Sequence, residues 1–316
     1  MVIIKLDTID NKQGGIIMPE TLIKNIADYS AIDLWRIRPR IEPERLLMCP
    51  PTFFEVVDIK NYFMRGQIGK VDKAKAQDQW QLYYELLCSL GLNIDLIEPI
   101  KGLEDMTFTA NSGVVWQEPE QSPRFLASNM LHPKRQFETR FFVNWFRQNG
   151  HKVEKLSNPN IFFEGGGDAV WYPDKMLLFG GYGQRTEIKA YSEMNRRWNI
   201  PIVLLELVSE EFYHLDTCFC ILDSDTVLFC PEAFSYNGVC LIESIFSNKI
   251  ELSKEQAKNF FAGNCFVPKP RTVVLQKGDN ITTTRLKNEG FNVIPIDLSE
   301  FIKSGGNATC LKLNIY

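Results

Sequence analysis

The sequence predicts an α/β fold assembled from five copies of one supersecondary unit. Clusters of polar and small residues recur about every 50 residues, at 105–111, 164–168, 214–217, 263–264 and 305–310. A short apolar segment follows each cluster, and the intervals contain a further strand and a helical stretch. Repeats with a period of this size are typical of circular or stacked arrays of supersecondary units.

Each repeat is interpreted as strand, strand, helix, strand. The first strands are expected at 113–116, 169–172, 218–222, 265–267 and 311–313, with second strands such as 175–179 and 226–230 and helices such as 134–149 and 188–198. Residues 1–45 lie outside the pattern and are taken as an N-terminal extension of unknown role, before a domain at 46–316. If the five units close in a ring, the polar clusters meet on one axis and bring together Asp105, Asn111, Glu164, Asp168, His214, Asp216, Asn264 and Cys310.

The composition is that of a globular protein. Of 316 residues, 45% are apolar and 23% are charged, which provides a sizeable core. The net charge of −4 argues against a nucleic-acid-binding surface over the whole chain. The longest apolar run, 202–208, is far shorter than the ~20 residues of a membrane span, and no signal peptide is visible. We therefore expect a cytoplasmic protein, without a nucleic-acid or membrane partner, whose eight cysteines are free thiols.

Six short motifs extend over most of the chain. They are MCPP at 48–51, DMTFTAN at 105–111, FEGGGD at 163–168, YHLDT at 213–217, PEAF at 231–234 and GGNATC at 305–310. In this order and spacing they resemble the guanidine-modifying (amidinotransferase) superfamily, which includes arginine deiminases, dimethylarginine dimethylaminohydrolases, glycine amidinotransferases and arginine dihydrolases. The resemblance is greatest to the cyanobacterial-type arginine dihydrolase domain. It covers about residues 46–314 and implies a five-bladed, pseudosymmetric α/β propeller, the pentein fold, built from ββαβ units.

The resemblance implies a cysteine-dependent reaction on a guanidino group. Because resonance makes the guanidinium carbon a poor electrophile, a soft sulfur nucleophile is suited to attack it and form a covalent adduct. We expect Cys310 to be that nucleophile, His214 to act as general acid and base, and Glu164 to orient His214. The other two histidines, His132 and His151, are expected at the surface.

The resemblance also implies a set of substrate-binding residues. Asp105 is expected to hold the distal nitrogens of the substrate, and Arg185 to bind its carboxylate through the planar guanidinium fork. Asp216 is expected to pair with the substrate guanidinium, since a strand through His214 and Asp216 would turn both side chains to one face. Phe108 and Asp168 complete the set, Asp168 as a support behind the others.

Three positions bear on the choice of substrate. Asn111 stands where deiminases, dimethylarginine hydrolases and amidinotransferases carry aspartate and where dihydrolases carry asparagine; a neutral amide can hold a ureido group as well as a cation. Asp216 is an acid where the dimethylarginine hydrolases usually carry lysine, which favours unmethylated arginine. Asn129 stands where the family often has a second arginine, which leaves recognition of the amino-acid end open.

We therefore expect a hydrolase of arginine or a close derivative, and first an arginine dihydrolase that releases ornithine, ammonia and carbon dioxide. An arginine deiminase, a dimethylarginine dimethylaminohydrolase, an amidinotransferase with an amine acceptor and a non-catalytic guanidino-ligand binder are the alternatives. No cofactor is expected. A metal site at His214, Asp216, Cys218 and Cys220 is disfavoured because adjacent strand residues cannot all reach one zinc ion. The expected partner is the small guanidino substrate, and a homo-oligomer is left open.

Overall fold

The computed structural model describes residues 21–316 and places five small β-sheets in the chain. Each sheet belongs to one repeating unit. In each unit the first two strands pair antiparallel, a helix follows, and a third strand pairs parallel with the second. The first unit comprises β4 (Gly113–Trp116), β5 (Arg124–Ala127), α3 (Pro133–Gln148) and β6 (Lys152–Glu154). The second comprises β7 (Ala169–Trp171), β8 (Leu178–Tyr182), α4 (Ile188–Trp198) and β9 (Ile202–Glu206). The third comprises β10 (Phe219–Ile221), β11 (Thr226–Phe229), α5 (Tyr236–Ile245) and β12 (Asn248–Glu251).

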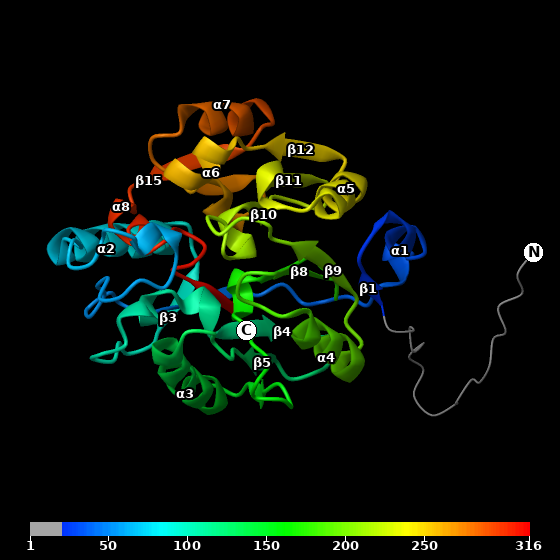
Figure 1. Ribbon diagram of the computed structural model, residues 1–316, viewed down its shortest axis with the longest axis horizontal. Helices are drawn as coiled ribbons and strands as arrows, with labels where there is room; N and C mark the ends of the chain where they lie inside the picture. Colours follow the sequence, from blue (N-terminus) through cyan, green and yellow to red (C-terminus); the bar gives the residue numbers. More distant parts are fainter. Residues whose placement is uncertain (1–20) are drawn as a thin grey trace, which may run out of the picture.

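The last two units complete the repeat, and the fifth joins the two ends of the domain. The fourth unit comprises β13 (Phe266–Lys269), β14 (Thr272–Gln276), α7 (Asn280–Asn288) and β15 (Asn292–Ile296). The fifth comprises β16 (Leu313–Ile315), β2 (Arg45–Met48), α2 (Lys73–Ser89) and β3 (Asn93–Leu96). In this unit Leu313 pairs with Leu47, so that the end of the chain completes the sheet that its beginning starts. The expected strand–strand–helix–strand unit is confirmed, and its five helices lie toward the outside of the molecule (Figure 1).

The helices form where the sequence provides both a start signal and an apolar face. Pro133 occupies the first turn of α3, where its missing N–H costs no hydrogen bond. Phe142 and Phe146 lie one turn apart on the buried side of this helix, and Phe146 stacks on Phe125 of β5 with a ring-centroid distance of 3.7 Å. Burial of this aromatic pair holds α3 against its own sheet.

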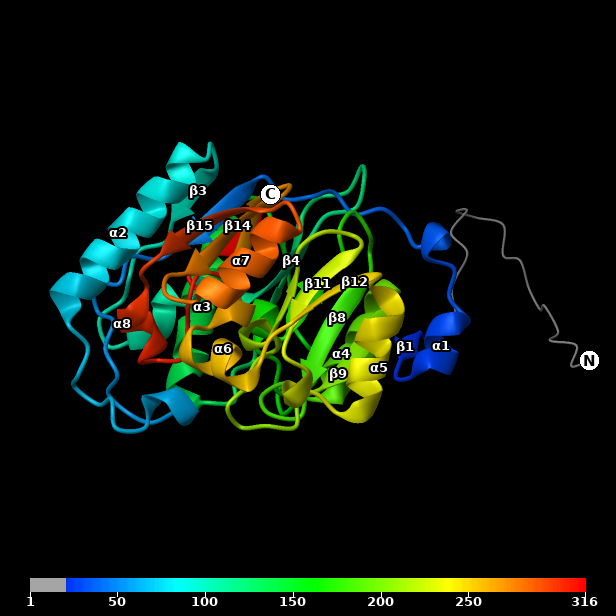
Figure 2. The same cartoon turned by 90° about the horizontal axis from the view of Figure 1, so that it is seen from above.

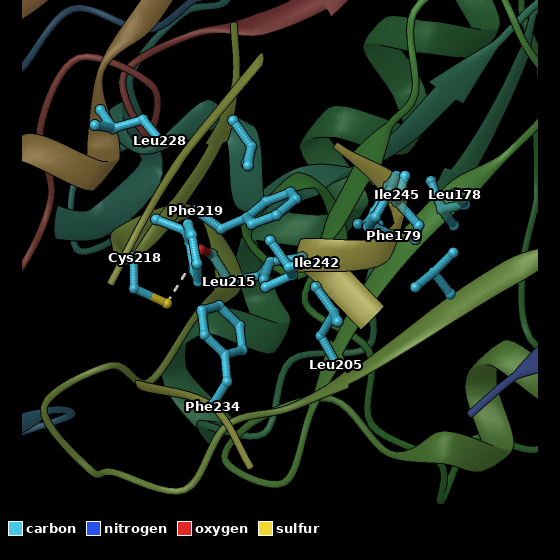
Figure 3. Packing of buried hydrophobic residues seen from close by; sticks show 14 of the residues in the cluster. Leu178, Phe179, Leu205, Leu215, Cys218, Phe219, Leu228, Phe234, Ile242 and Ile245 are labelled. Atoms are coloured by element: carbon cyan, nitrogen blue, oxygen red, sulfur yellow. Dashed lines mark hydrogen bonds between the residues drawn. The ribbon is translucent and has the colours of Figure 1, made fainter. Parts of the chain in front are cut away.

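Large apolar side chains fill the space between the second and third units. Phe179 of β8 and Phe219 of β10 lie 5.3 Å apart between ring centroids, and both are buried. Ile242 of α5 and Phe234 pack around the same group (Figure 3). These contacts tie neighbouring sheets together through side chains, because the described residues include no strand shared between two sheets.

The first four polar clusters form short 3-10 helices just before the first strands, whereas the fifth, at 305–310, has turns and irregular backbone. These are Glu104–Thr107, Thr109–Ser112, Gly165–Gly167, Leu215–Thr217 and Ala262–Asn264; others lie at Leu34–Arg36, Tyr62–Met64 and Pro231–Ala233. The expectation that His214 and Asp216 share a strand face was therefore wrong. A tight helical turn directs them instead, because the Thr217 hydroxyl and backbone N–H both donate to the His214 carbonyl and close the chain on itself.

Residues 21–44 contact the outer edge of the second unit. β1 (Leu22–Ile23) runs parallel to β9 and adds a fourth strand to that sheet, and α1 (Ile26–Ser30) contacts α5. Figure 2 shows β1 and α1 at one end of the molecule and α2 at the other. The short helices α6 (Lys254–Asn259) and α8 (Ser299–Ile302) complete the elements. Within residues 21–316 no helix has the length and apolarity to cross a membrane.

Candidate active site

His214 and Glu164 form a buried hydrogen-bonded pair. Nε2 of His214 lies 2.7 Å from Oε2 of Glu164, and both side chains are almost fully buried. The same oxygen accepts from Nη1 of Arg185 at 2.9 Å, while Oε1 accepts from the backbone N–H of Leu131. Burial alone would raise the pKa of Glu164, but Arg185 and His214 outweigh it and hold the pKa well below its usual range. Glu164 is therefore a carboxylate that is hydrogen-bonded to His214.

Arg135 determines which way the amide of Asn111 points. Its Nη1 lies 3.1 Å from Oδ1 of Asn111, and a guanidinium can only donate, so this atom has to be the amide oxygen. The amide nitrogen then faces Nδ1 of His214 at 3.4 Å. Because an amide N–H donates, Nδ1 accepts and the imidazole proton lies on Nε2, where it is donated to Glu164. His214 thus presents an unprotonated Nδ1 on the Asn111 side.

Gly167 makes the approach of Asn111 and His214 possible. A Cβ at this position would lie 2.4 Å from Nδ2 of Asn111 and 3.0 Å from Nδ1 of His214. Any other residue type would push the two side chains apart. The glycine run after Glu164 therefore leaves room for the pair.

Cys310 is held between an acid and an amide. Its thiol donates to Oδ2 of Asp216 at 3.1 Å, and Nδ2 of Asn264 donates to the sulfur at 3.2 Å. Burial, followed by the charge of Asp216, raises the pKa of Cys310 well above its usual value. Gly305, five residues before the thiol, has the left-handed φ of +82°, and its carbonyl accepts from the Tyr213 hydroxyl at 2.6 Å. In this state Cys310 is a thiol.

Asp216 is a buried carboxylate with an unused acceptor. Oδ2 accepts a hydrogen bond from the Cys310 thiol, but Oδ1 is buried without a hydrogen-bond partner among residues 21–316. Burial raises the pKa of Asp216 to about 7, against smaller opposing effects of Cys310 and Asn264. An unpaired acceptor of this kind is costly unless a donor reaches it. A planar cation with several N–H groups is a suitable donor.

A small cavity of about 20 Å³ lies next to these groups. It is lined by Lys60, Asn61, Met64, Asp105, Phe108, Asn111, Arg135, Arg185, Tyr213, Ser304, Gly306 and Cys310. Five of the expected site residues are in this wall. His214, Glu164 and Asp216 lie behind it and contact lining residues, so the structure brings the expected catalytic groups together.

Asp168 and Asn129 do not line the cavity. Asp168 accepts from the Thr186 hydroxyl at 2.6 Å and from the backbone N–H of Leu215 at 3.1 Å, so it anchors the turn after His214 from behind. Asn129 donates to the carbonyls of Pro159 and Ile161 and so joins two segments of backbone. Asp168 therefore lies behind the cavity wall, and the amide nitrogen of Asn129 is committed to backbone carbonyls.

Several residues of the site were missed from the sequence. Lys60 and Asn61 come from the loop after MCPP, and Arg135 from the first turn of α3. Tyr213, within a quoted motif, stacks near His214 with 4.6 Å between ring centroids. No spacing signal links the loop and α3 to the other clusters, since both lie outside the polar repeats.

The expectation for His151 was wrong. It is only 5% exposed, because its ring packs edge-on against Phe146 and its Nδ1 lies 3.1 Å from the carbonyl of Asn149. Burial lowers the pKa of His151, so it is a neutral core residue at neutral pH. All eight cysteines, which lie within the described residues, are free.

Comparisons with known proteins agree with this geometry. Residues 52–316 match the family model of eukaryotic N,N dimethylarginine dimethylhydrolase. The bifunctional arginine dihydrolase/ornithine cyclodeaminase AgrE of Nostoc sp. is 36% identical over 273 residues, which are 86% of this chain and 38% of AgrE. This chain thus spans well under half of that relative. N(G),N(G)-dimethylarginine dimethylaminohydrolase of Mycobacterium tuberculosis is 34% identical, with 86% of each chain covered.

The solved structures show the same fold. The N-terminal domain of ArgZ, a cyanobacterial arginine dihydrolase, bound to product, matches with a TM-score of 0.81 and 34% identity, over 86% of this chain and 97% of that domain. A variant of that domain in which a serine replaces an asparagine holds a covalently bound reaction intermediate; it matches with a TM-score of 0.81 and 33% identity over the same shares. The match with the family model covers most of the chain, and the chain belongs to the N,N dimethylarginine dimethylhydrolase family of α/β proteins.

Proposed function

We propose that the protein is a cysteine-dependent hydrolase that converts arginine to ornithine, ammonia and carbon dioxide. The observation that carries this proposal is the arrangement of Asp216, with one oxygen on the Cys310 thiol and the other buried without a donor. A guanidinium placed against Asp216 satisfies that acceptor and brings its carbon next to the sulfur. The arginine dihydrolase relatives support the choice of arginine.

Substrate binding itself activates the nucleophile. In the empty site the negative charge and burial around Cys310 raise its pKa, which disfavours the thiolate. A guanidinium cation reverses that field, because an adjacent positive charge stabilises the thiolate. The thiol proton moves to Nδ1 of His214, the sulfur attacks the guanidinium carbon, and His214 returns the proton to the departing ammonia. The product of this step is a thiouronium adduct on Cys310.

Water then completes the hydrolysis. His214 takes a proton from water as the oxygen adds to the adduct carbon, and the resulting tetrahedral centre can expel either sulfur or a second ammonia. Loss of sulfur gives citrulline and a free thiol. Loss of ammonia gives a thiocarbamate on Cys310, which a second water cleaves to a carbamic acid that decomposes to ornithine and carbon dioxide. The neutral amide of Asn111, which contacts His214, suits the second route because it can hold an uncharged group.

The other lining residues hold the rest of the substrate. Asp105 faces the cavity and is placed for the distal nitrogen, while Phe108 supports the aliphatic part of the substrate. Arg185 lines the cavity with its guanidinium over the Tyr213 ring, 4.9 Å from the ring centroid. Arg185 is expected to bind the carboxylate of the substrate, although its Nη1 already donates to Glu164.

The five ββαβ units are proposed to surround this site as the blades of a propeller. Contacts run from the 3-10 helix Thr109–Ser112 to Gly165–Gly167, from there to Leu215–Thr217, and on to Ala262–Asn264. Cys310 follows the fourth unit and bonds to Asn264. This order of contacts is the one that a pentein arrangement requires, with each unit delivering its polar turn to the centre.

Demethylamination of dimethylarginine is the second candidate. The family model and the M. tuberculosis relative support it, since both are named for that reaction. Asp216 counts against it, because a dimethylated nitrogen has no N–H to donate to this carboxylate and dimethylarginine therefore offers it fewer donors than arginine does.

Incubation of the protein with arginine, dimethylarginine, monomethylarginine, agmatine and citrulline, with products identified by mass, tests the proposal. We expect ornithine and two equivalents of ammonia from arginine without an added amine. Dimethylamine release from dimethylarginine, with arginine untouched, would establish the second candidate instead, and dependence on an amine acceptor would establish a transferase.

Replacement of the nucleophile provides the matched test of mechanism. We expect Cys310→Ser to lower ammonia release at least ~10³-fold with an unchanged melting temperature, because the hydroxyl is a far weaker nucleophile than the thiolate. Cys88→Ser, at an exposed cysteine, is the control and should retain full activity. Activity of Cys310→Ser within a few-fold of the wild type would remove Cys310 from this role.

A further inference from the structure

Lys60 is a buried cation at the junction of two cavities. Its side chain is only 3% exposed. It lines the inner cavity with Cys310 and also an outer cavity of about 280 Å³, which Tyr62, Arg65 and Gln184 line as well. Arg185 is the other cation that lines both. A substrate whose guanidinium lies at Cys310 therefore extends its opposite end toward Lys60 and Arg185.

The ammonium of Lys60 has a donor to spare. It contacts Asp105 at 3.2 Å and forms an ion pair with Asp58, and these are its acceptors among the described residues. An ammonium carries three N–H groups, so one is available. Burial would lower the pKa of Lys60, but Asp105 and Asp58 outweigh it and raise the pKa, so the side chain is charged at neutral pH.

The backbone of Lys60 also positions Arg185. Nη2 of Arg185 donates to the carbonyl of Lys60, and Nη1 donates to Glu164. The two cationic side chains are thereby fixed relative to one another. Asn129 does not contribute here, because its amide nitrogen is committed to two backbone carbonyls.

We propose that Lys60 is a specificity-determining residue that, with Arg185, binds the carboxylate of the substrate. This inference rests on the proposed function and deepens it. Asp105 lies between Lys60 and Arg135, at 3.2 and 3.9 Å, and Lys60 also pairs with Asp58. A substrate that brings only an ammonium to this end leaves the spare donor of Lys60 without an acceptor. A substrate with a carboxylate provides the counter-charge that Lys60 and Arg185 can bind.

The test compares three guanidino compounds that differ only at the distal end. Arginine has a carboxylate and an amine, 5-guanidinopentanoate has only the carboxylate, and agmatine has only the amine. For the wild type we expect kcat/KM for 5-guanidinopentanoate to exceed that for agmatine at least 100-fold. Equal values, or a preference for agmatine, would overturn the inference without the use of any variant.

A Lys60→Met variant assigns the preference to the side chain. We expect KM for arginine to rise at least tenfold with kcat changed less than threefold, and kcat/KM for agmatine to stay the same or rise. Lys60→Arg, which keeps the charge, should restore most of the preference. An equal loss on all three compounds would show that Lys60 only supports the structure and would overturn the inference.

Lys134→Met is the matched control. Lys134 shares Asp58 with Lys60, at 3.2 Å, but its side chain is 54% exposed and lines neither cavity. Its substrate preference should equal that of the wild type. If the wild type releases ammonia from none of the compounds, the proposed function itself fails; turnover with a preference that Lys60→Met leaves unchanged removes only the role of Lys60.

Discussion

At the scale of single residues, the amide of Asn111 is oriented by one neighbour and acts on another. Arg135 donates to the amide oxygen of Asn111, so that the amide N–H donates to His214. In Asn111→Asp both oxygens only accept, so Nδ1 of His214 has to carry a proton, and the carboxylate also disfavours an uncharged intermediate. We expect the product ratio to shift from ornithine toward citrulline by about tenfold, measured by mass.

The control for this substitution is an exposed asparagine. Oδ1 of Asn158 accepts from the backbone N–H of Asn160, a role that aspartate also performs. Asn158→Asp should therefore leave the product ratio unchanged. An unaltered ratio in Asn111→Asp would contradict the proposed role of the amide in releasing the second ammonia.

The pKa of Asp216 predicts an acid limb in the pH profile. Burial raises this pKa to about 7, and only the ionised form pairs with a guanidinium. Because kcat/KM reports the free enzyme, we expect it to fall toward tenfold per pH unit below about 7. Asp216→Asn should have low activity and lack this limb. A wild-type profile that is flat down to pH 5 would contradict the prediction.

The same shift has a defined sign for stability. An acid whose pKa is higher in the folded state than in the unfolded chain binds more protons when folded, so stability falls as pH rises between the two values. For Asp216 this interval runs from the ordinary aspartate pKa of 3.8 to about 7. The melting temperature of Asp216→Asn should therefore rise relative to that of the wild type across this interval. A difference in melting temperature that stays constant with pH would show that the pKa of Asp216 is not raised by folding.

At the scale of elements, the 3-10 helix Gly165–Gly167 leaves space between units. Gly167→Ala would place a methyl group 2.4 Å from Nδ2 of Asn111, so the site has to move apart. Since a displacement of about 1 Å can cost about 100-fold in rate, we expect a loss of that order in kcat. Gly150→Ala, at φ +80° with nothing near its Cβ, should lower the melting temperature and leave kcat unchanged. Full activity of Gly167→Ala would contradict the argument.

The periodic pattern predicted the regular elements well. The helix expected at 188–198 and the strand at 113–116 have those bounds in the structure. The turns were harder, because a 3-10 helix leaves no periodicity in three residues, and the Leu215–Thr217 turn was assigned to a strand. The expected site residues came from polar clusters, whereas Lys60 and Arg135 reach the cavity through a loop and a helix that tertiary packing alone brings there.

At the scale of the whole molecule, the chain contacts its own beginning twice. β16 pairs with β2 of the fifth unit, so Cys310 precedes a strand held by a segment from near the beginning of the chain. Residues 21–44 then reach the second unit on the outside, where β1 pairs with β9 and Arg38 donates to the carbonyls of Trp198 and Asn199. The sequence left the role of this extension undetermined, because its contacts are with distant segments, such as Glu118, 80 residues from Arg38, and Trp198, 160 residues from it.

Removal of residues 1–44 should separate stability from activity. Ile23 and Ile37 are buried at 0% and 4% exposure, and burial of two such side chains contributes up to about 3–6 kcal/mol. The deletion also exposes the edge of β9. We expect the melting temperature to fall by about 5–15 °C. KM should stay within twofold, because none of the residues that line either cavity belongs to 21–44.

A deletion of residues 1–20 is the control that isolates the contribution of residues 21–44, including β1 and α1. A large rise in KM with an unchanged melting temperature would contradict the prediction, since it would mean that the extension acts on the site and not on the second unit.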